Sequence, residues 1–497
     1  PLASFPGPIH YRAFPLPHLI QEWSGNTVHK WVELHRKYGD VVRISPNQLS
    51  YISVNAWRDI YGARGSSTSS LKGASSETML KEQLEFPGDD FEFFAPEKPM
   101  ISCDATNHTR HRRAVGPAFS DRAVRSYESV LIRYTDDMLN RLQLEDQEGT
   151  TTIGVNMMDW FHFVMFDMTS ALVFGKSFGN MTKKEYHPWV ARIFPGMKLI
   201  AWSLVITAIP GLGRLVSWFI PKKMVDEARR HMQSIVDMTD SRAAEPLAQQ
   251  PDFMTYIHPQ VNHHQPGFKP FSSSSTGSTL STPELYLNSQ LLCIAGSETT
   301  ASLLAGAVYF LSQPENKPHL ARLLAELQSN FASEEEITPS RLNPNTTPFL
   351  CAVLSECLRL YPPGAINMPR TVAPAGALID GKYVPGGTVV GIAQYAAYRS
   401  PRHWVDSTKF APERWLSLES SRSVDDRNEV FKPFSYGPRN CVGQNLALAE
   451  CRLITARLFW RFEVDMLPGQ EGWIDGQRTF LSWEKPALMV KLSPREH

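Results

Sequence analysis

Residues 434–443 read Phe-Ser-Tyr-Gly-Pro-Arg-Asn-Cys-Val-Gly, and a helical pattern of apolar residues follows them. Gly437 and Pro438 predict a loop with Cys441 at its tip, just before the helix. The first amides of a helix have no partner inside it and form its positive end. We therefore expect these amides, together with Arg439, to lower the pKa of Cys441 and favour the thiolate. A small buried cysteine in a loop is the alternative interpretation.

Five positions of this stretch match the haem-binding signature of the cytochrome P-450 superfamily: Phe434, Gly437, Arg439, Cys441 and Gly443. Chance would produce such a match in a chain of 497 residues with a probability on the order of 10⁻⁴. The resemblance implies that these residues bind haem b, with Cys441 as the axial thiolate of the iron. It also implies a fold that is mainly α with a small β-rich part. In that fold the haem lies between a long distal helix and a proximal helix preceded by the cysteine loop.

The composition argues against several other classes of protein. Fifty basic and fifty acidic residues cancel, so we expect no nucleic-acid partner. The six cysteines include no Cys-x-x-Cys pair, which indicates neither a zinc site nor a disulfide framework. No Gly-x-Gly-x-x-Gly follows a predicted strand, so the chain shows no means of holding NADPH or flavin itself.

The resemblance extends from about residue 27 to residue 485, which indicates a single catalytic domain over residues 1–497. No N-terminal run of about twenty apolar residues is present. Residues 1–25 resemble the proline-rich hinge after the membrane anchor of microsomal members, so we expect an anchor that is missing here. Residues 262–282 are rich in serine and poor in apolar residues, and we expect a mobile loop.

Apolar spacing predicts several packing elements. A helix is expected from Asn26 or Thr27 to Gly39, followed by a hairpin around Pro46-Asn47. Residues 160–178 predict a buried helix, and residues 381–391 predict a second hairpin.

A strongly apolar segment covers residues 194–220 but is broken at Pro210-Gly211, so each piece is too short to cross a bilayer. Core packing is the better interpretation for the first half. The second half, residues 210–223, ends in two lysines after Trp and Phe residues, which suits a membrane interface.

Ser281-Thr282-Pro283-Glu284 predicts the start of a long helix, because a capping hydroxyl precedes a first-turn proline and an early carboxylate. The helix runs toward Gln313-Pro314 and is apolar nearly all round, which indicates burial. Its middle, residues 295–300, reads Ala-Gly-Ser-Glu-Thr-Thr. A glycine there costs ~1 kcal/mol relative to alanine, and an unpaired charge costs more. Such violations mark functional sites, although a kink with Thr299 bonding a carbonyl one turn back would also explain them.

This pattern resembles the acid–alcohol pair that the superfamily carries on its distal helix. The resemblance implies that Ala295 borders the substrate pocket and that Gly296 lets O₂ and substrate approach. It implies that Thr299 hydrogen-bonds the oxygen and that Glu298 relays protons with water. Because relatives that rearrange peroxides often lack this pair, its presence favours a monooxygenase.

His108 and Arg112 are four residues apart and share one helical face. A basic helical turn is more often solvated surface. The resemblance nevertheless implies that His108, Arg112 and Arg370 bind the haem propionates through charge-assisted hydrogen bonds.

Glu356 and Arg359 match the superfamily's Glu-x-x-Arg and fall on an apolar helix, so we expect an ion pair that is at least partly buried. Arg414, in Pro412-Glu413-Arg414-Trp415, completes the triad that fixes the cysteine loop. Trp415 stands where relatives have phenylalanine, which casts no doubt on the role.

Apolar and aromatic side chains are the pocket candidates that the resemblance implies, and they predict a lipophilic substrate. For the aromatic loop at 86–94, plain surface packing is equally open. The candidates are Phe91, Phe93, Phe94, Ala295, Ala365, Ile366, Phe480 and Leu481.

The resemblance as a whole implies a fungal enzyme of secondary metabolism that hydroxylates an unactivated C–H bond of a terpenoid, polyketide or alkaloid. O₂ is the expected co-substrate, and electrons are expected from NADPH through a membrane-bound NADPH–cytochrome P-450 reductase. Lys432 and Arg452 are candidates for docking its acidic face, although a solvated surface explains these two residues equally well. We expect a monomer at the cytosolic face of the endoplasmic reticulum membrane, soluble or peripheral without its anchor. Epoxidation, oxidative ring formation, desaturation or isomerisation on the same fold remain alternatives, as does a non-catalytic haem sensor.

Overall fold

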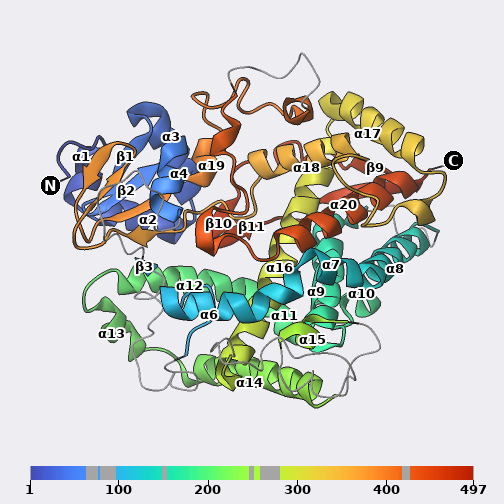
Figure 1. Ribbon diagram of the computed structural model, residues 1–497, viewed down its shortest axis with the longest axis horizontal. Coiled ribbons are helices and arrows are strands. Elements are labelled where there is room, and N and C mark those ends of the chain that lie inside the picture. Colours follow the sequence, from blue (N-terminus) through green and yellow to red (C-terminus); the bar gives the residue numbers. More distant parts are fainter. Residues whose placement is uncertain are drawn as a thin grey trace.

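Helix α16 (Thr282–Leu311) runs through the centre of the molecule (Figure 1). The computed structural model describes residues 2–62, 77–78, 97–147, 154–245, 251–257, 280–416 and 426–495. α16 starts with a capping box, as predicted: the Ser281 hydroxyl accepts from the Glu284 amide, and the Glu284 carboxylate accepts from the Ser281 amide. These bonds satisfy amides that the helix leaves unpaired.

The larger hydrophobic core surrounds α16. Helices α9 (Met157–Phe174), α18 (Pro348–Leu360) and α20 (Gln444–Arg461) lie against it. Nearly every side chain of α9 is buried, which confirms the buried helix expected at 160–178. Such burial holds the central helices in place, at roughly 25 cal/mol for each Å² of apolar surface removed from water.

Further helices cover this core or pack beside it. They are α1 (Ile9–Ala13), α2 (Leu16–Ser24), α3 (Thr27–Tyr38), α4 (Val54–Tyr61), α6 (Ala105–Val115), α7 (Asp121–Ser126), α8 (Glu128–Gln147), α10 (Asn180–Lys183), α11 (Pro188–Ala191), α12 (Ile193–Thr207), α13 (Leu212–Ser217), α14 (Lys222–Ala244), α15 (Phe253–Ile257), α17 (Lys317–Asn330) and α19 (Gln394–Tyr398).

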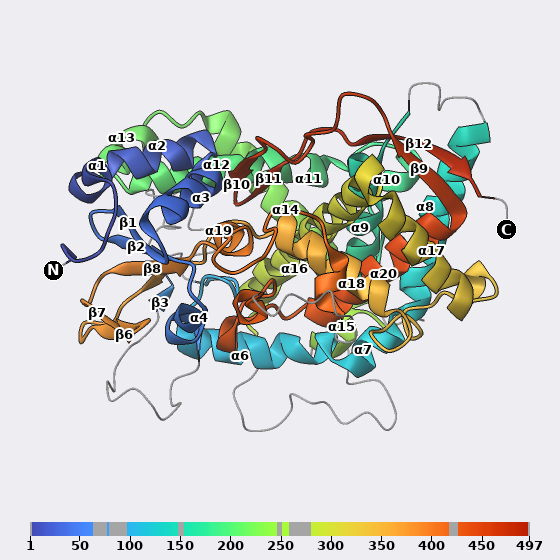
Figure 2. The same cartoon turned by 90° about the horizontal axis from the view of Figure 1, so that it is seen from above.

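The β-rich part lies at the N-terminal end of the molecule and encloses a second, smaller core (Figure 2). Its main sheet has the strand order β1-β2-β8-β5-β3, in which only β2 and β8 are parallel. The order β4-β12-β9 forms a second sheet, and β6-β7 and β10-β11 are hairpins. The strands are β1 (Val41–Ser45), β2 (Gln48–Tyr51), β3 (Glu77–Thr78), β4 (Val155–Asn156), β5 (Arg370–Thr371), β6 (Ala377–Ile379), β7 (Lys382–Val384), β8 (Val389–Ile392), β9 (Phe462–Met466), β10 (Arg478–Phe480), β11 (Ser482–Glu484) and β12 (Met489–Pro494).

Two of these local predictions are confirmed and one needs correction. α3 ends before Gly39, and β1 and β2 form the expected hairpin. The hairpin predicted for 381–391 is wrong, because the chain turns at Asp380-Gly381 between β6 and β7, whereas β8 joins β2 and β5. Residues 2–25, the segment expected to follow an anchor, contain α1 and α2, and Leu2 and Phe5 are buried in the smaller core.

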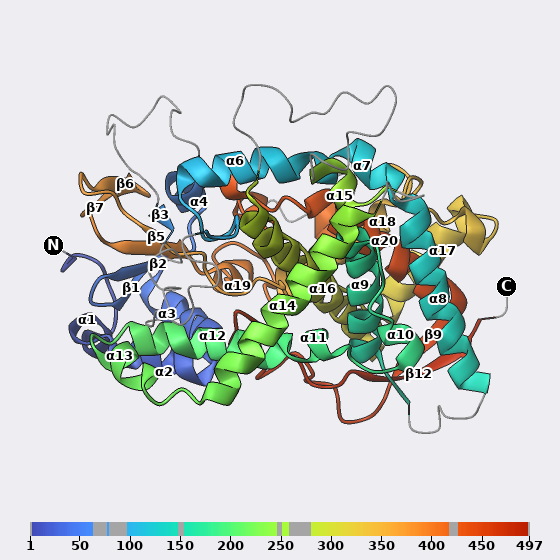
Figure 3. The same ribbon diagram turned by 90° about the horizontal axis from the view of Figure 1, so that it is seen from below.

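The expectation of core packing for the first half of the apolar segment is also wrong. Of α12, only Ile193 and Val205 are buried, and the helix lies on the surface beside α2 and α13 (Figure 3). With α11 it forms a stretch, Pro188–Thr207, that among the described residues is long and apolar enough to span a membrane and is only 17% buried, which corrects the expectation that each piece is too short. The only other such helix there is α16, which is 72% buried and belongs to the core.

Helix α6 carries His108 and Arg112, and an ion pair fixes it to the start of α16. The guanidinium of Arg110 donates to both carboxylate oxygens of Glu284. His111 Nε2 lies 3.0 Å from the same carboxylate. The capping carboxylate of α16 therefore also positions the helix with the predicted propionate ligands.

We expect Glu284→Gln to lower the free energy of unfolding at neutral pH and to flatten its acid dependence. The Arg110 hydrogen bond, working against burial, lowers the pKa of Glu284 from 4.5 to about 2. Because the folded-state pKa is depressed, the stabilisation is complete above the unfolded-state pKa of about 4.5 and is lost as the pH falls toward about 2. Urea unfolding at a series of pH values measures it. Parallel pH curves for the two proteins would contradict the assignment.

Candidate active site

The cysteine loop is closed by its own backbone. Gly437–Arg439 form a single 3₁₀ turn, and the Cys441 amide donates to the Phe434 carbonyl oxygen at 2.9 Å. Gly437 has φ +78°, and a Cβ at this position would overlap the carbonyl oxygen of Tyr61. Both facts require glycine here. The predicted helix follows at once, since α20 begins at Gln444.

Cys441 differs from the other five cysteines, of which four are buried and one is partly exposed, because its residue is exposed. Burial of its thiol raises the pKa of Cys441 above its ordinary value, while the Gly443 amide and Arg112 lower it by less, so the expectation of a lowered pKa is wrong. Because Cys441 is exposed, a ligand can approach the tip of the loop. The expected effect of Arg439 is corrected: its guanidinium donates to the Cys103 carbonyl oxygen at 2.8 Å, and Arg112 is the cation that acts on the thiol.

Four basic side chains converge beside this loop: His108 and Arg112 from α6, Arg370 from β5 and Arg439 from the loop itself. Among the described residues, none of the four forms an ion pair with a carboxylate. Burial, followed by Arg439 and Arg112, lowers the pKa of His108 to about 4. Uncompensated buried charge is costly, so this cluster fits an anionic ligand. The two propionates of haem supply the required charge and the acceptors.

The middle of α16 presents an open face. Ala295 and Thr299 lie one turn apart and are both exposed, although the helix around them is buried. The Thr299 hydroxyl donates to the Ala295 carbonyl oxygen at 2.7 Å, as the kink interpretation expected. A Cβ on Gly296 would lie 3.4 Å from Cγ2 of Thr169 in α9, which is ordinary contact. The role of Gly296 in O₂ access therefore stays a prediction.

Glu298 is buried and paired, which the sequence did not indicate. Its Oε2 lies 2.9 Å from Nε2 of His162 in α9, and Nζ of Lys485 contacts Oε1. Burial raises the pKa of Glu298, but Lys485 and His162 together outweigh it and lower the pKa to about 2. The two partners stand 136 and 187 residues away along the chain, so no local spacing could have revealed them.

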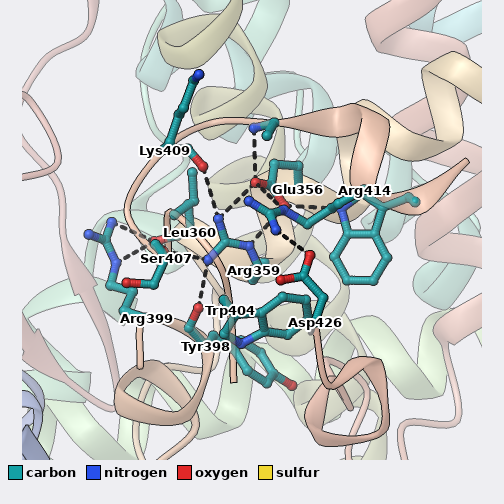
Figure 4. A network of polar contacts seen from close by, with 12 residues as sticks. Glu356, Arg359, Leu360, Tyr398, Arg399, Trp404, Ser407, Lys409, Arg414 and Asp426 are labelled. Carbon is teal, nitrogen blue, oxygen red and sulfur yellow. Dashed lines mark hydrogen bonds and ion pairs between the residues drawn. The ribbon is translucent and has the colours of Figure 1, made fainter. Parts of the chain in front are cut away.

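Glu356 and Arg359 form a fully buried ion pair at the centre of a polar network (Figure 4). Nε and Nη2 of Arg359 donate to the two carboxylate oxygens at 2.9 and 2.7 Å, and Nε of Arg414 donates to Oε1 at 3.1 Å. The predicted triad geometry is therefore present. The other N–H groups of Arg359 donate to the backbone carbonyls of Tyr398, Ser407 and Lys409.

This network also holds the segment that leads into the cysteine loop. Nη1 of Arg414 lies 2.5 Å from Oδ2 of Asp426. The Lys432 amide donates to the Tyr398 hydroxyl at 2.7 Å. One point of the chain shortly before Phe434 is thus tied to Arg414, which bonds Glu356, and another to Tyr398, which bonds Arg359. These ties explain how a distant ion pair fixes the loop.

Trp415, the departure from the family pattern, is part of the network. Its indole Nε1 donates to Oε2 of Glu356 at 3.0 Å, a bond that phenylalanine cannot make. The ring also packs on Phe431 with centroids 4.5 Å apart. The sequence predicted tolerance at this position but not the added hydrogen bond.

The predicted pocket residues have different environments. Ala365 belongs to the larger core and Ile366 packs against it. Phe480 is buried and lies edge-on to Trp202, with ring centroids 6.2 Å apart. Leu481, with φ +71°, forms the turn between β10 and β11. Phe91, Phe93 and Phe94 lie outside the described residues, as does most of the loop predicted at 262–282.

We expect Gly437→Ala to distort the cysteine loop. A left-handed conformation costs a non-glycine residue roughly 1–2 kcal/mol, and the overlap with Tyr61 adds to this cost. Gly381→Ala is the matched control, because Gly381 has φ +74° with no atom within 4 Å of the added Cβ. Urea unfolding and the haem content of the purified proteins should show a larger loss for Gly437→Ala. Equal losses would show that the close approach to Tyr61 is unimportant.

We expect Trp415→Phe to destabilise the protein by about 1.5–3 kcal/mol, the contribution of a hydrogen bond to a charged acceptor. Trp404→Phe serves as the comparison, since Nε1 of Trp404 donates to the neutral carbonyl of Ala397 at 3.1 Å. Its loss should cost about 1 kcal/mol for the bond. Chemical denaturation measures both, and a smaller effect for Trp415→Phe would refute the predicted order.

Comparisons with known proteins agree with this geometry. The family model described as Cytochrome P450 matches residues 6–492. The chain is 36% identical to cytochrome P450 monooxygenase astJ of Aspergillus oryzae and to cytochrome P450 monooxygenase astA of Talaromyces wortmannii, in each case over 100% of this chain and 92% of the relative. It is 35% identical to cytochrome P450 monooxygenase lcsI of Purpureocillium lilacinum, over 99% of this chain and 90% of the relative. The chain therefore belongs to the cytochrome P450 family, as a monooxygenase of the fungal type.

Proposed function

We propose that this protein is a haem-thiolate monooxygenase that hydroxylates an unactivated C–H bond of a lipophilic secondary metabolite, such as a terpenoid, polyketide or alkaloid. The family implies haem and O₂, with electrons from a reductase. Fungal relatives and the apolar character of Ala365, Ile366, Phe480 and Leu481 support the substrate class.

One observation carries the proposal: the exposed Cys441 lies beside Arg112, which belongs to a cluster of four basic side chains that form no ion pair with a carboxylate among the described residues. Haem b with a thiolate ligand requires a thiol for its iron and basic side chains for its two propionates, and this site offers both. When bound, haem with its thiolate ligand supplies the activation of O₂.

The residues of the chain then have separate tasks. Cys441 binds the iron, and His108, Arg112, Arg370 and Arg439 bind the propionates. Thr299 holds a proton at its hydroxyl, and Glu298 moves protons toward it from the buried side of α16. Ala295, on the same open face as Thr299, leaves room for substrate. Phe434, Gly437 and Gly443 shape the loop.

Electron transfer from a reductase requires a docking surface on this protein. A recess of about 400 Å³ beside the cysteine loop is suitable for this purpose. Lys432 and Arg452 line this recess together with Phe434 and Leu448. We propose that these basic groups meet acidic groups of an NADPH–cytochrome P450 reductase, with NADPH as the electron source.

A separate apolar surface suits a membrane. On α13 and the residues after it, Leu215, Trp218, Phe219 and Ile220 are 52%, 84%, 76% and 37% exposed, just before the lysines at 222–223. Ile9, Phe14, Leu16 and Ile20 are also exposed. They belong to the segment of α1 and α2, which lies beside α12 and α13 in Figure 2. Trp23 of α2 and Trp202 of α12 stack with centroids 4.9 Å apart and join the two areas. We propose that this face rests on the cytosolic side of the endoplasmic reticulum membrane.

The reduced carbon monoxide difference spectrum tests the proposal. We expect a thiolate-type Soret shift for the natural protein and its loss in Cys441→His, while the haem is still retained through the basic cluster. Absence of the shift in the natural protein would end the haem-thiolate assignment. With a substrate identified from spin-state shifts, product analysis under ¹⁸O₂ then separates hydroxylation from isomerisation or desaturation, which leave no ¹⁸O in the organic product.

A further inference from the structure

A continuous hydrogen-bonded chain leads from the middle of α16 through α9 to a tyrosine and an aspartate. Glu298 Oε2 lies 2.9 Å from Nε2 of His162, and Nδ1 of the same imidazole lies 3.0 Å from the Tyr186 hydroxyl. That hydroxyl lies 2.6 Å from Oδ1 of Asp159. Asn156 donates to the other oxygen of Asp159 at 2.6 Å. Four polar groups from three segments of the chain are thus joined in line.

The chain connects the core to the solvent. Glu298 and His162 are 2% and 5% exposed, whereas Tyr186 and Asp159 are each partly exposed. Asp159 stands one turn before His162 on α9, and Tyr186 bridges the two residues from the segment between α10 and α11. A proton that enters at Asp159 therefore meets a bonded partner at every step inward.

In its ordinary protonation state this chain of side chains holds one proton fewer than it has hydrogen bonds. Its three hydrogen bonds each hold one proton, but Tyr186 and a neutral His162 provide only two if Asp159 and Glu298 are ionised. The third proton must therefore sit on the imidazole or on one of the two carboxyl groups. All three bonds form together only when the chain carries this additional proton.

The surroundings make the additional proton transferable. Burial lowers the pKa of His162, and Glu298 raises it by less, so an imidazolium here gives up its proton readily. Lys485 also acts against a charged His162. At the inner end, Lys485 and His162 hold the pKa of Glu298 low, so a protonated Glu298 is a strong acid. At the outer end, burial and Asp159 raise the pKa of Tyr186, which therefore keeps its proton between transfers.

We propose that Asp159, Tyr186 and His162 form the route by which solvent protons reach Glu298. This inference rests on the proposed function and adds the source of its protons. Tyr186 and His162 are positioning and relay residues and touch neither substrate nor cofactor.

Each transfer balances within the chain. Asp159 takes a proton from water and passes it to the Tyr186 oxygen while the Tyr186 proton moves to Nδ1 of His162. The imidazole releases its Nε2 proton to Glu298 and keeps the incoming proton on Nδ1, and a half-turn of the ring then presents the protonated nitrogen to Glu298 before the second proton enters. In hydroxylation, one O₂, two protons and two electrons from NADPH convert one C–H bond to C–OH and form one water. The route carries both protons.

A purely structural role is the competing explanation, because the same contacts fasten α9 to α16. The His162 ring also packs on Phe194 with centroids 4.7 Å apart. Tyr186→Phe separates the two roles, since it removes one hydroxyl and keeps the ring contacts and the pair of Glu298 with Lys485. Tyr286→Phe is the matched control, because the Tyr286 hydroxyl donates to Asp240 at 2.7 Å but is not joined to Glu298.

The first measurement concerns the chain itself. In the haem-loaded ferrous carbon monoxide complex with ¹⁵N-labelled histidine, the ring signals of His162 are assigned by their loss in His162→Gln. We expect Tyr186→Phe to shift the Nδ1 signal and Tyr286→Phe to leave it unchanged. An unchanged signal in Tyr186→Phe would mean that the chain is interrupted at this point, which overturns the proposal.

The second measurement concerns proton delivery. With reductase and NADPH and no organic substrate, the ratio of NADPH to O₂ consumed gives the share of O₂ reduced to water rather than to hydrogen peroxide. We expect Tyr186→Phe to lower the ratio of water to peroxide about tenfold, less than the roughly 10²-fold cost of losing a proton-transfer group outright, since water offers a parallel path. Asp159→Asn, at a partly exposed position, should change the ratio in the same direction.

The outcomes are distinct. A shifted His162 signal with an unchanged water-to-peroxide ratio would assign the chain a structural role and overturn the proposal, while the thiolate-type spectrum stays intact. Should Tyr186→Phe fail to fold, Asp159→Asn decides by the same ratio. Loss of the thiolate-type spectrum in the natural protein would instead refute the proposed function.

Discussion

The buried pair of Glu356 and Arg359 is the interaction on which the site depends most. Removing two charges from water costs several kcal/mol for each ion, and only complete hydrogen bonding repays it. Here every N–H of Arg359 has an acceptor, and both oxygens of Glu356 receive donors. Loss of one partner would leave an uncompensated charge, at a cost of about 3–5 kcal/mol. Because Arg414 and Tyr398 attach the segment before Phe434 to this pair, the position of Cys441 follows from it.

The cluster of basic side chains beside the cysteine loop differs from this pair, because its charges form no ion pairs in the part of the chain that the structure describes. His108, Arg112, Arg370 and Arg439 come from three separate parts of the chain, and among the described residues none of them forms an ion pair with a carboxylate, although the charge of Asp104 acts on Arg439. Repulsion among these four side chains lowers the stability of the folded state. An anion that binds there stabilises the folded state by mass action, so folding and cofactor binding support each other at this site.

Much of this could be predicted where the signal is local. The cap at Ser281 and Glu284, the three-residue spacing of Glu356 and Arg359, and the glycine at 437 are each fixed by backbone geometry within a few residues. The partners of Glu298 could not be predicted, because His162 and Lys485 meet it only through tertiary packing. The same limit explains the wrong hairpin at 381–391, since the pairing of β8 with β2 is a long-range choice. The surface position of α12 could not be predicted either, as an apolar sequence does not reveal which neighbour covers it.

One peptide group carries a further consequence of the way α6 meets the loop. Nη1 of Arg112 donates to the carbonyl oxygen of Asn440 at 2.6 Å, and the nitrogen of that same peptide group belongs to Cys441. A cation at the oxygen draws electron density along the amide and makes its N–H a stronger donor toward Phe434. Arg112 thus strengthens the hydrogen bond from the Cys441 amide to Phe434 without taking part in it. A shift of α6 would therefore change the polarisation of the peptide group next to the sulfur.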